Sequence, residues 1–222
     1  MREELDRIEM VKKYMIEHTI NDPYPQFIIE PEIVEYASWV TELMLKRTRK
    51  SIGKEQVEQG VIGQELFSGF LLQYKIANVY ANPLYEDMTM RQKEGKHFDF
   101  FVPHMPEGKR IISVKTTSED PKDKKFLANV ESWENEIHDI AVAIKIDSLS
   151  AHRAHIAGWL DSADVESLPT QDLGCGLAYW TFLNPDSVND NIEYEPTLKP
   201  LNPAPNIVEE LLKGSFIPTK KG

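Results

Sequence analysis

The chain has 222 residues, of which 41% are hydrophobic. A chain of this length can bury a core without disulfides or a structural metal, and its composition excludes a fibrous or disordered protein. A single cysteine, Cys175, excludes an internal disulfide framework and a cysteine-based zinc site. No stretch approaches the roughly 18 apolar residues of a membrane-spanning helix, so we expect a cytoplasmic protein without membrane contact.

Basic residues are concentrated in two parts of an acidic chain. The net charge of −11 argues against a protein that coats nucleic acid. Residues 91–125 nevertheless carry nine Lys and Arg against six Asp and Glu, and residues 46–54 carry five basic residues and no acid. Basic patches on an acidic body can bind a polyanion while limiting non-specific contacts. We predict nucleic-acid contacts from the following side chains of these segments: Lys46, Arg47, Arg49, Lys50, Lys122 and Lys124.

Helices are predicted for the first third of the chain. Residues 2–17 place apolar side chains at helical spacing, and a turn-rich break follows at residues 21–25. A second helix is predicted from about Pro31 to Lys50, because proline suits the first turn of a helix. The cations that end this helix have a simpler alternative function, which is to stabilise the negative end of its dipole. A third helix is predicted over residues 54–79.

Strands are predicted from residue 98 onward. Phe98–Val102 and Arg110–Thr117 form a hairpin, because Pro106–Lys109 between them has the composition of a turn. Alternating apolar residues over Asp139–Asp147 predict another strand. Further strands are predicted at residues 155–159 and 177–183, and further helices at residues 129–137 and 207–213.

The order of these elements predicts one α/β (α+β) domain, with helices flanking a mixed central β-sheet. Residues 1–53 form a helical N-terminal extension in this interpretation. Residues 54–183 form the core, and residues 184–222 form an irregular C-terminal wrap.

Residues capable of chemistry meet on the predicted hairpin. Side chains alternate between the two faces of a strand, so Ser113 and Lys115 share one face. The same alternation directs Asp99 away from its aromatic neighbours, and the hairpin brings Asp99 close to Lys115. Glu65 lies on the apolar stripe of the third predicted helix, where a carboxylate needs a partner or a metal. We expect this helix to direct Glu65 at Asp99, so that the site can hold a divalent cation and an activated water.

This arrangement resembles the PD-(D/E)xK nuclease superfamily, which includes restriction endonucleases, over about residues 60–159. The resemblance places Asp99 at the family's first acid and Glu65 at its helical acid. Ser113-Val114-Lys115 falls on the (D/E)-x-K tripeptide. The resemblance implies a restriction-endonuclease-like fold and Mg²⁺-dependent hydrolysis of nucleic-acid phosphodiesters, with Mn²⁺ as a substitute. It also implies that Asp99, the Val114 carbonyl oxygen and Glu65 hold the metal, while Lys115 orients or deprotonates the attacking water.

Two positions depart from the family pattern. Phe98 precedes Asp99 where the motif has proline, and Ser113 replaces the second acid. Some restriction endonucleases of this superfamily also contain S-x-K and take the missing carboxylate from a nearby helix. Glu131 and Glu134 lie in such a segment, so we expect one of them to supply it. If neither does, the site is degenerate.

The function expected from these observations is that of a restriction-type DNA endonuclease. A structure-specific repair nuclease is its close alternative, and a catalytically inactive DNA- or protein-binding module of the same fold is the other. The expected partner is double-stranded DNA. A homodimer is also expected, because cutting both strands of a symmetric site usually uses a two-fold dimer.

Overall fold

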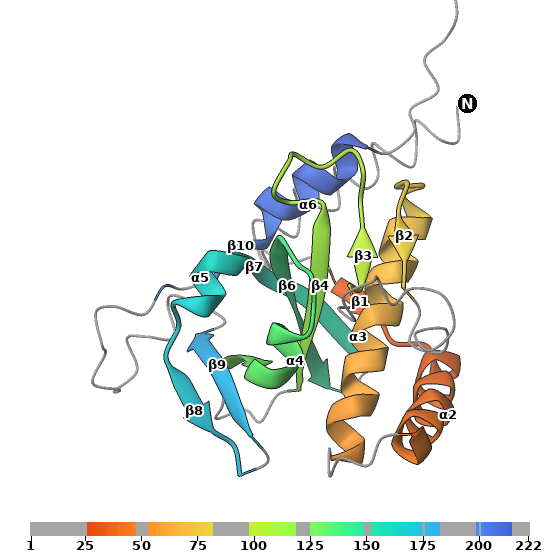
Figure 1. Ribbon diagram of the computed structural model, residues 1–222. Helices are drawn as coiled ribbons and strands as arrows, with labels where there is room; N and C mark the ends of the chain where they lie inside the picture. Colours follow the sequence, from red (N-terminus) through yellow and green to blue (C-terminus); the bar gives the residue numbers. More distant parts are fainter. Residues whose placement is uncertain are drawn as a thin grey trace, which may run out of the picture.

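The computed structural model describes residues 26–47, 53–81, 98–118, 125–148, 152–174, 176–182, 199 and 201–214 (Figure 1). Its centre is a curled, mixed β-sheet flanked by helices, and a smaller antiparallel sheet lies beside it. The predicted α/β class with a mixed central sheet is therefore confirmed. The predicted helix at residues 2–17 and most of residues 184–200 lie outside the described residues.

Seven strands make up the central sheet. Their order is β1 (Gln26–Ile28), β7 (Arg153–Asp161), β6 (Ile140–Ser148), β4 (Ile111–Ser118), β3 (Phe100–Phe101) and β2 (Val79–Tyr80), with β10 (Asn202–Pro203) also paired to β7. Strands β4 and β6 are parallel, whereas the other pairs are antiparallel. A parallel pair needs a crossover connection, and the segment between β4 and β6 provides it.

The predicted hairpin is confirmed. Phe100 pairs with Ile112 and Phe101 with Ile111 in antiparallel register. In the turn between the strands, the Lys109 N–H donates to the Pro106 carbonyl at 3.0 Å. Gly108 has a φ of 77° there, a left-handed conformation that favours glycine.

Three helices, α2 (Pro31–Arg47), α3 (Lys54–Gln73) and α6 (Ala204–Lys213), contribute buried residues to the larger hydrophobic core on one face of this sheet. The prediction that the third helix continues to Val79 is wrong, because Val79 lies in β2. The helix ends at Gln73 with Tyr74 as its cap, and Lys75 just beyond has a φ of 54°. The Ile76 N–H then donates to the Leu71 carbonyl at 2.8 Å. This hydrogen bond gives a carbonyl of the last helical turn a partner without extending the helix.

The other face of the sheet carries a second core. It is built from helices α4 (Val130–Glu134) and α5 (Ser162–Glu166) and from the small sheet of β5 (Lys125–Asn129), β9 (Leu177–Phe182) and β8 (Thr170–Asp172). The helix predicted over residues 129–137 is therefore shorter. Asn129 limits it at the N-terminus, since its side chain accepts a hydrogen bond from the Ser132 N–H at 2.9 Å. Strands β1, β2, β5, β8 and β10 and helix α5 were not predicted.

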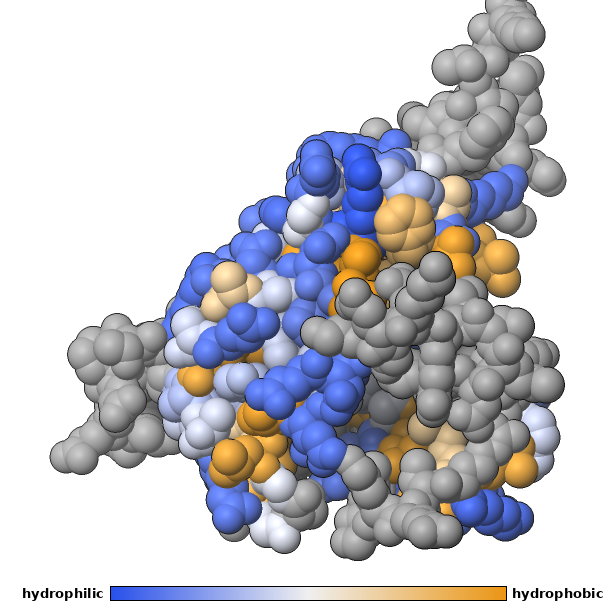
Figure 2. Space-filling model, in the orientation of Figure 1, coloured by the Kyte–Doolittle hydropathy of each residue, from blue (hydrophilic) through white to orange (hydrophobic). Residues whose placement is uncertain are grey.

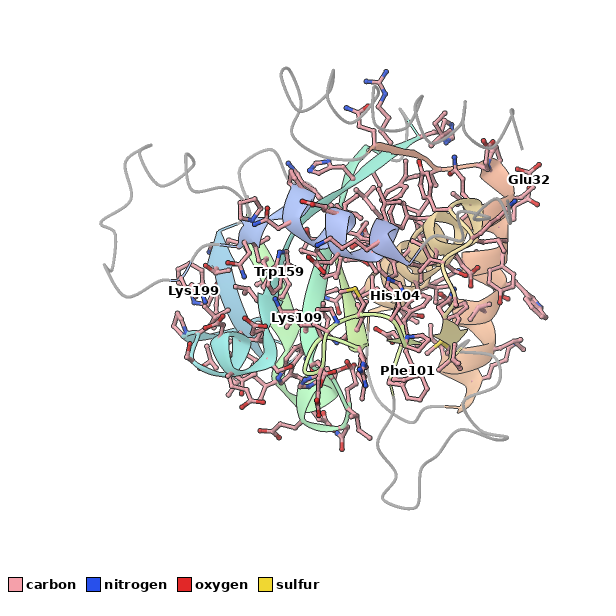
Figure 3. All side chains as sticks on the ribbon, turned by 90° about the horizontal axis from the view of Figure 1, so that it is seen from above. Glu32, Phe101, His104, Lys109, Trp159 and Lys199 are labelled. Atoms are coloured by element: carbon pink, nitrogen blue, oxygen red, sulfur yellow. The ribbon has the colours of Figure 1, made fainter. Side chains whose placement is uncertain are left out.

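The end of the chain contributes to the core rather than only covering it. Leu201, Ile207 and Leu211 are buried, and α6 packs on β7. His104 lies beside α6 (Figure 3), and its ring contacts the Leu211 carbonyl at 3.0 Å. The helix predicted at residues 207–213 is confirmed and begins three residues earlier, at Ala204, and its apolar residues at helical spacing make it amphipathic.

Candidate active site

Helix α3 lies unusually close to strand β4. A Cβ atom added to Gly63 would lie 1.8 Å from the Thr116 hydroxyl oxygen, so only glycine permits this approach. The next residue on the helix, Gln64, donates a hydrogen bond from its amide nitrogen to Asp99 Oδ1 at 2.8 Å. The close packing of helix on strand therefore brings a helical side chain to the hairpin carboxylate.

Asp99 is held at the end of β3 by donors from two elements. Its side chain is buried, with 8% exposed. Besides the Gln64 contact, its Oδ2 atom accepts a hydrogen bond from the Val114 N–H at 2.6 Å and lies 3.3 Å from the Ser113 hydroxyl oxygen. A buried carboxylate needs such donors, since an unpaired charge is costly away from water. The structure thus brings Asp99 together with Ser113 and Val114, as the alternation predicted, and the Val114 group in contact is its N–H.

Glu136 is the second carboxylate at this position. Its Oε2 atom accepts a hydrogen bond from the Ser113 hydroxyl at 2.6 Å. The Lys115 ammonium lies 2.9 Å from Oε1 and 2.7 Å from Oε2, and both side chains are largely buried. The Ser132 hydroxyl donates to Oε1 at 2.7 Å. Asp99 and Glu136 therefore both lie within hydrogen-bonding reach of the Ser113 hydroxyl.

The donors around Glu136 decide its charge. Burial alone would raise the pKa of Glu136. The positive charge of Lys115, together with hydrogen bonds from Lys115, Ser113 and Ser132, outweighs burial and lowers the pKa below its ordinary value. Glu136 is thus an ionised carboxylate at neutral pH, in the position beside Asp99 where the tripeptide has serine.

The acid found beside Ser113 is neither of the two that the sequence analysis expected there. Glu131 and Glu134 lie on α4 and are exposed. Glu136 follows the helix, in the link that enters β6. No local sequence signal singles out Glu136, whereas the structure does: β6 begins at Ile140, four residues later, and Ile140 pairs with Ile112 beside Ser113. A residue just before β6 is therefore close to the strand that carries Ser113.

Glu65 does not reach Asp99 by a direct hydrogen bond of its own. Its Oε1 atom accepts a hydrogen bond from the Tyr80 hydroxyl at 2.8 Å, and the Tyr80 ring stacks on Phe100 with centroids 4.6 Å apart. Burial raises the pKa of Glu65, against the lowering effect of the Tyr80 hydroxyl. Burial also raises the pKa of Tyr80, as do the charges of Glu65 and Asp99. Gln64, rather than Glu65, is the residue of α3 that binds Asp99.

The predicted nucleic-acid contacts are only partly described. Lys46 is exposed near the end of α2. Lys54, at the start of α3, lies 3.8 Å from Glu42, and both are exposed. The side chains of Arg47, Arg49, Lys50, Lys122 and Lys124 lie outside the described residues.

The residues of the site fit a divalent cation, with the small number of carboxylates that a magnesium site in a protein can have. Within the described parts of the chain, no group of three or more His, Cys, Asp and Glu side chains could hold a metal ion. Mg²⁺, however, is commonly bound through one or two carboxylates, with water and substrate phosphates completing its shell. Asp99 and Glu136 provide two carboxylates around one hydroxyl. Beside them, the Gln64 amide oxygen is buried without a hydrogen-bond partner among the described residues.

Comparisons of the chain with family models, curated proteins and solved structures gave no match. None of the described helices is long and apolar enough to span a membrane. The described surface is mainly hydrophilic in the view of Figure 2, and apolar atoms appear there in separate patches. The geometry of the Asp99 region is therefore what supports a function.

Proposed function

We propose that the chain is a metal-dependent nuclease of the restriction-endonuclease-like fold, with Glu136 as the acid that the S-x-K tripeptide omits. One observation carries the proposal. The Glu136 carboxylate lies on the Ser113 hydroxyl, beside Asp99 and against Lys115. An acid, a second acid and a lysine are thus close in space, although the second acid is 23 residues from Ser113 along the chain.

Asp99 and Glu136 would hold Mg²⁺, or Mn²⁺ in its place. Bound there, the cation would polarise a phosphoryl oxygen of the substrate and lower the pKa of a bound water. Asp99 is oriented for this by the Val114 N–H and the Gln64 amide. The Ser113 hydroxyl fixes the spacing between the two carboxylates, because it donates to one and lies within reach of the other.

Lys115 has two functions in this proposal. Its ammonium neutralises Glu136 before the cation is present. With Glu136 as a ligand of the cation, the ammonium would be available to orient the attacking water or to stabilise negative charge on the phosphate. The Trp133 ring, whose centroid is 5.4 Å from the Lys115 nitrogen, limits where that ammonium can move.

Double-stranded DNA is the proposed substrate, cut by a restriction-type homodimer in a cytoplasmic setting. A structure-specific repair nuclease would use the same site on a different DNA shape. One observation favours the alternative of an inactive binding module of the same fold. The Lys115–Glu136 pair is closed, and a closed pair is compatible with a structural ion pair that never exchanges for a metal.

The test is cleavage of supercoiled plasmid with Mg²⁺ or Mn²⁺, with EDTA as the metal-free control. The proposal predicts metal-dependent nicking or linearisation by the wild type and none by Asp99→Asn. Calorimetry with Mn²⁺ on the same two proteins measures the metal site directly. Wild-type binding of Mn²⁺ without cleavage would support the inactive module. Cleavage that survives in Asp99→Asn would place the chemistry elsewhere.

A further inference from the structure

A row of polar side chains crosses the central sheet beside the candidate active site. Alternation puts Thr117 on the same face of β4 as Ser113 and Lys115. Thr117 pairs with Lys145 on β6, and Lys145 pairs with His155 on β7. Arg153, two residues before His155 on β7, shares this face. We call Thr117, Lys145, His155 and Arg153 the sheet-face row.

Burial confirms which way the row faces. Ile144 and Ile146, the neighbours of Lys145 on β6, are buried in the core on the α3 side. Lys145 is only partly buried and must therefore point to the opposite face, which carries Lys115. His155 lies likewise between two buried residues, Ala154 and Ile156. The row thus continues the face of the sheet that carries the candidate active site.

Thr117 adds an unsatisfied hydroxyl to this part of the face. Its side chain is 9% exposed, and its hydroxyl oxygen is buried with no hydrogen-bond partner among the described residues. Leaving a buried hydroxyl unpaired costs about 1–3 kcal/mol. Lys145 lies across the sheet from it, and Lys115, two residues before it on β4, is paired with Glu136. A hydroxyl donor beside the Lys145 ammonium is complementary to an anionic group that accepts hydrogen bonds.

The length of the row and the sign of its charge suit a segment of nucleic-acid backbone. Adjacent strands are about 4.8 Å apart, so Thr117 to His155 covers about 10 Å. Duplex DNA carries one negative charge per about 1.7 Å of its axis, which gives roughly six charges over that length. The chain as a whole has a net charge of −11, so a phosphate backbone would be repelled from most of it. Cations gathered on one face therefore favour one path for the backbone.

We propose that the sheet-face row binds the phosphate backbone of the nucleic acid and directs it to Lys115. The inference deepens the proposed nuclease function, on which it rests, by locating the substrate. It places the principal phosphate contacts on β6 and β7 instead of at residues 46–50. In the bound state the Lys145 ammonium and the Arg153 guanidinium neutralise phosphates, and the Thr117 hydroxyl donates to a phosphate oxygen.

The test measures binding of a fluorescein-labelled 30-base-pair duplex in EDTA, over a series of salt concentrations. The double variant Lys145→Gln/Arg153→Gln should bind roughly tenfold more weakly, and the slope of log Kd against log salt should fall by about two. The matched control is Lys199→Gln/Lys213→Gln, which makes the same change of charge at two exposed lysines. This control should keep the wild-type slope.

Two further variants keep the test independent of folding. Lys145→Arg retains the charge and should bind as the wild type does, whereas Thr117→Val, which keeps the shape, should weaken binding about threefold. A variant at the other basic segment, Lys46→Gln/Arg47→Gln, should change the slope less than the row variant does. Thermal melts of every variant identify any loss of binding that follows from unfolding.

The inference would be overturned if the row variant kept the wild-type salt slope, if the control lost as much affinity, or if the wild type bound no duplex. These results differ from a failure of the proposed function. A wild type that binds the duplex through the row and cleaves nothing with Mg²⁺ or Mn²⁺ supports the row and contradicts the nuclease. A wild type that cleaves while the row variant binds normally supports the nuclease and contradicts the row.

Discussion

The two sides of strand β4 each present one carboxylate, and the two carboxylates are in opposite electrostatic states. Glu136, on the α4 side, accepts hydrogen bonds from Ser113, Ser132 and Lys115, and its pKa is lowered. Glu65, on the α3 side, accepts a hydrogen bond from Tyr80, and its pKa is raised by burial. The more deeply buried carboxylate is thus the one kept ionised, because the donors and the cation around Glu136 outweigh the effect of burial.

The difference indicates which carboxylate can work with Asp99. A divalent cation needs a ligand that is already ionised, and Glu136 is kept so by Lys115. Glu65 is better suited to hold the Tyr80 ring against Phe100 than to bind a metal. The family resemblance gave the helical acid a metal-binding function, whereas the geometry favours the acid on the opposite side of the strand.

The largest expected effect comes from removing the charge of Glu136. Glu136→Gln should lower plasmid cleavage about 10³-fold or more, because groups that act as a unit fail together. Glu131→Gln and Glu134→Gln are the matched controls, because both residues lie on the exposed side of α4. These two variants should cleave the plasmid as the wild type does. Loss of cleavage in either control, with Glu136→Gln active, would exclude Glu136 as the second acid.

Folding must be checked in that experiment. Breaking a buried ion pair by removing one partner costs about 3–5 kcal/mol. The double variant Lys115→Met/Glu136→Gln removes both charges and should recover most of this stability while remaining inactive. Chemical denaturation of the wild type and the two variants measures the difference.

The next largest effect is expected where α3 meets β4. Gly63→Ala places a Cβ atom on Thr116 and should reduce the free energy of unfolding by about 1–3 kcal/mol. Gly60→Ala and Gly69→Ala on the same helix have no atom within 4 Å of the added Cβ. They should be neutral or stabilise by up to about 1 kcal/mol, since alanine is the better helix former. Equal effects at the three glycines would show that the close approach is unimportant.

A smaller effect is expected for Gln64. Gln64→Leu removes the donor to Asp99 and should weaken Mn²⁺ binding, measured by calorimetry, by roughly tenfold. Gln59→Leu is the control, because Gln59 lies on the same helix and its amide bonds to Glu55, away from the site. Equal Mn²⁺ affinity in the wild type and both variants would show that Gln64 packs beside Asp99 without contributing to metal binding.

The smallest effect should appear in the pH dependence of stability, to which the two carboxylates contribute with opposite signs. Since the pKa of Glu65 is raised from 4.5, its charge costs stability above that pH, and Glu65→Gln should raise Tm by about 1–2 °C at pH 7 but not at pH 4. Since the pKa of Glu136 is lowered from 4.5, its contribution is present above that pH and is lost as pH falls through the lowered value. Melts of both Gln variants from pH 3 to 7 measure the signs, and parallel curves would contradict the comparison.

The sequence by itself determined the hairpin and the shared face of Asp99 and Ser113. These follow from two local rules, the alternation of side chains along a strand and the turn composition of residues 106–109. It also determined the strand at β6, because alternating apolar residues are an unambiguous signal. The amphipathic character of residues 207–213 predicted the last helix for the same reason.

Only the tertiary structure decided which carboxylate joins Asp99. Glu131, Glu134 and Glu136 are equivalent in local sequence, and no periodicity distinguishes them. The parallel pairing of β4 with β6 returns the crossover to the sheet beside Ser113, and this places Glu136 on the site while Glu131 and Glu134 face solvent. Contacts between residues distant in the chain decide such choices, because they depend on how elements pack and not on what each segment prefers alone.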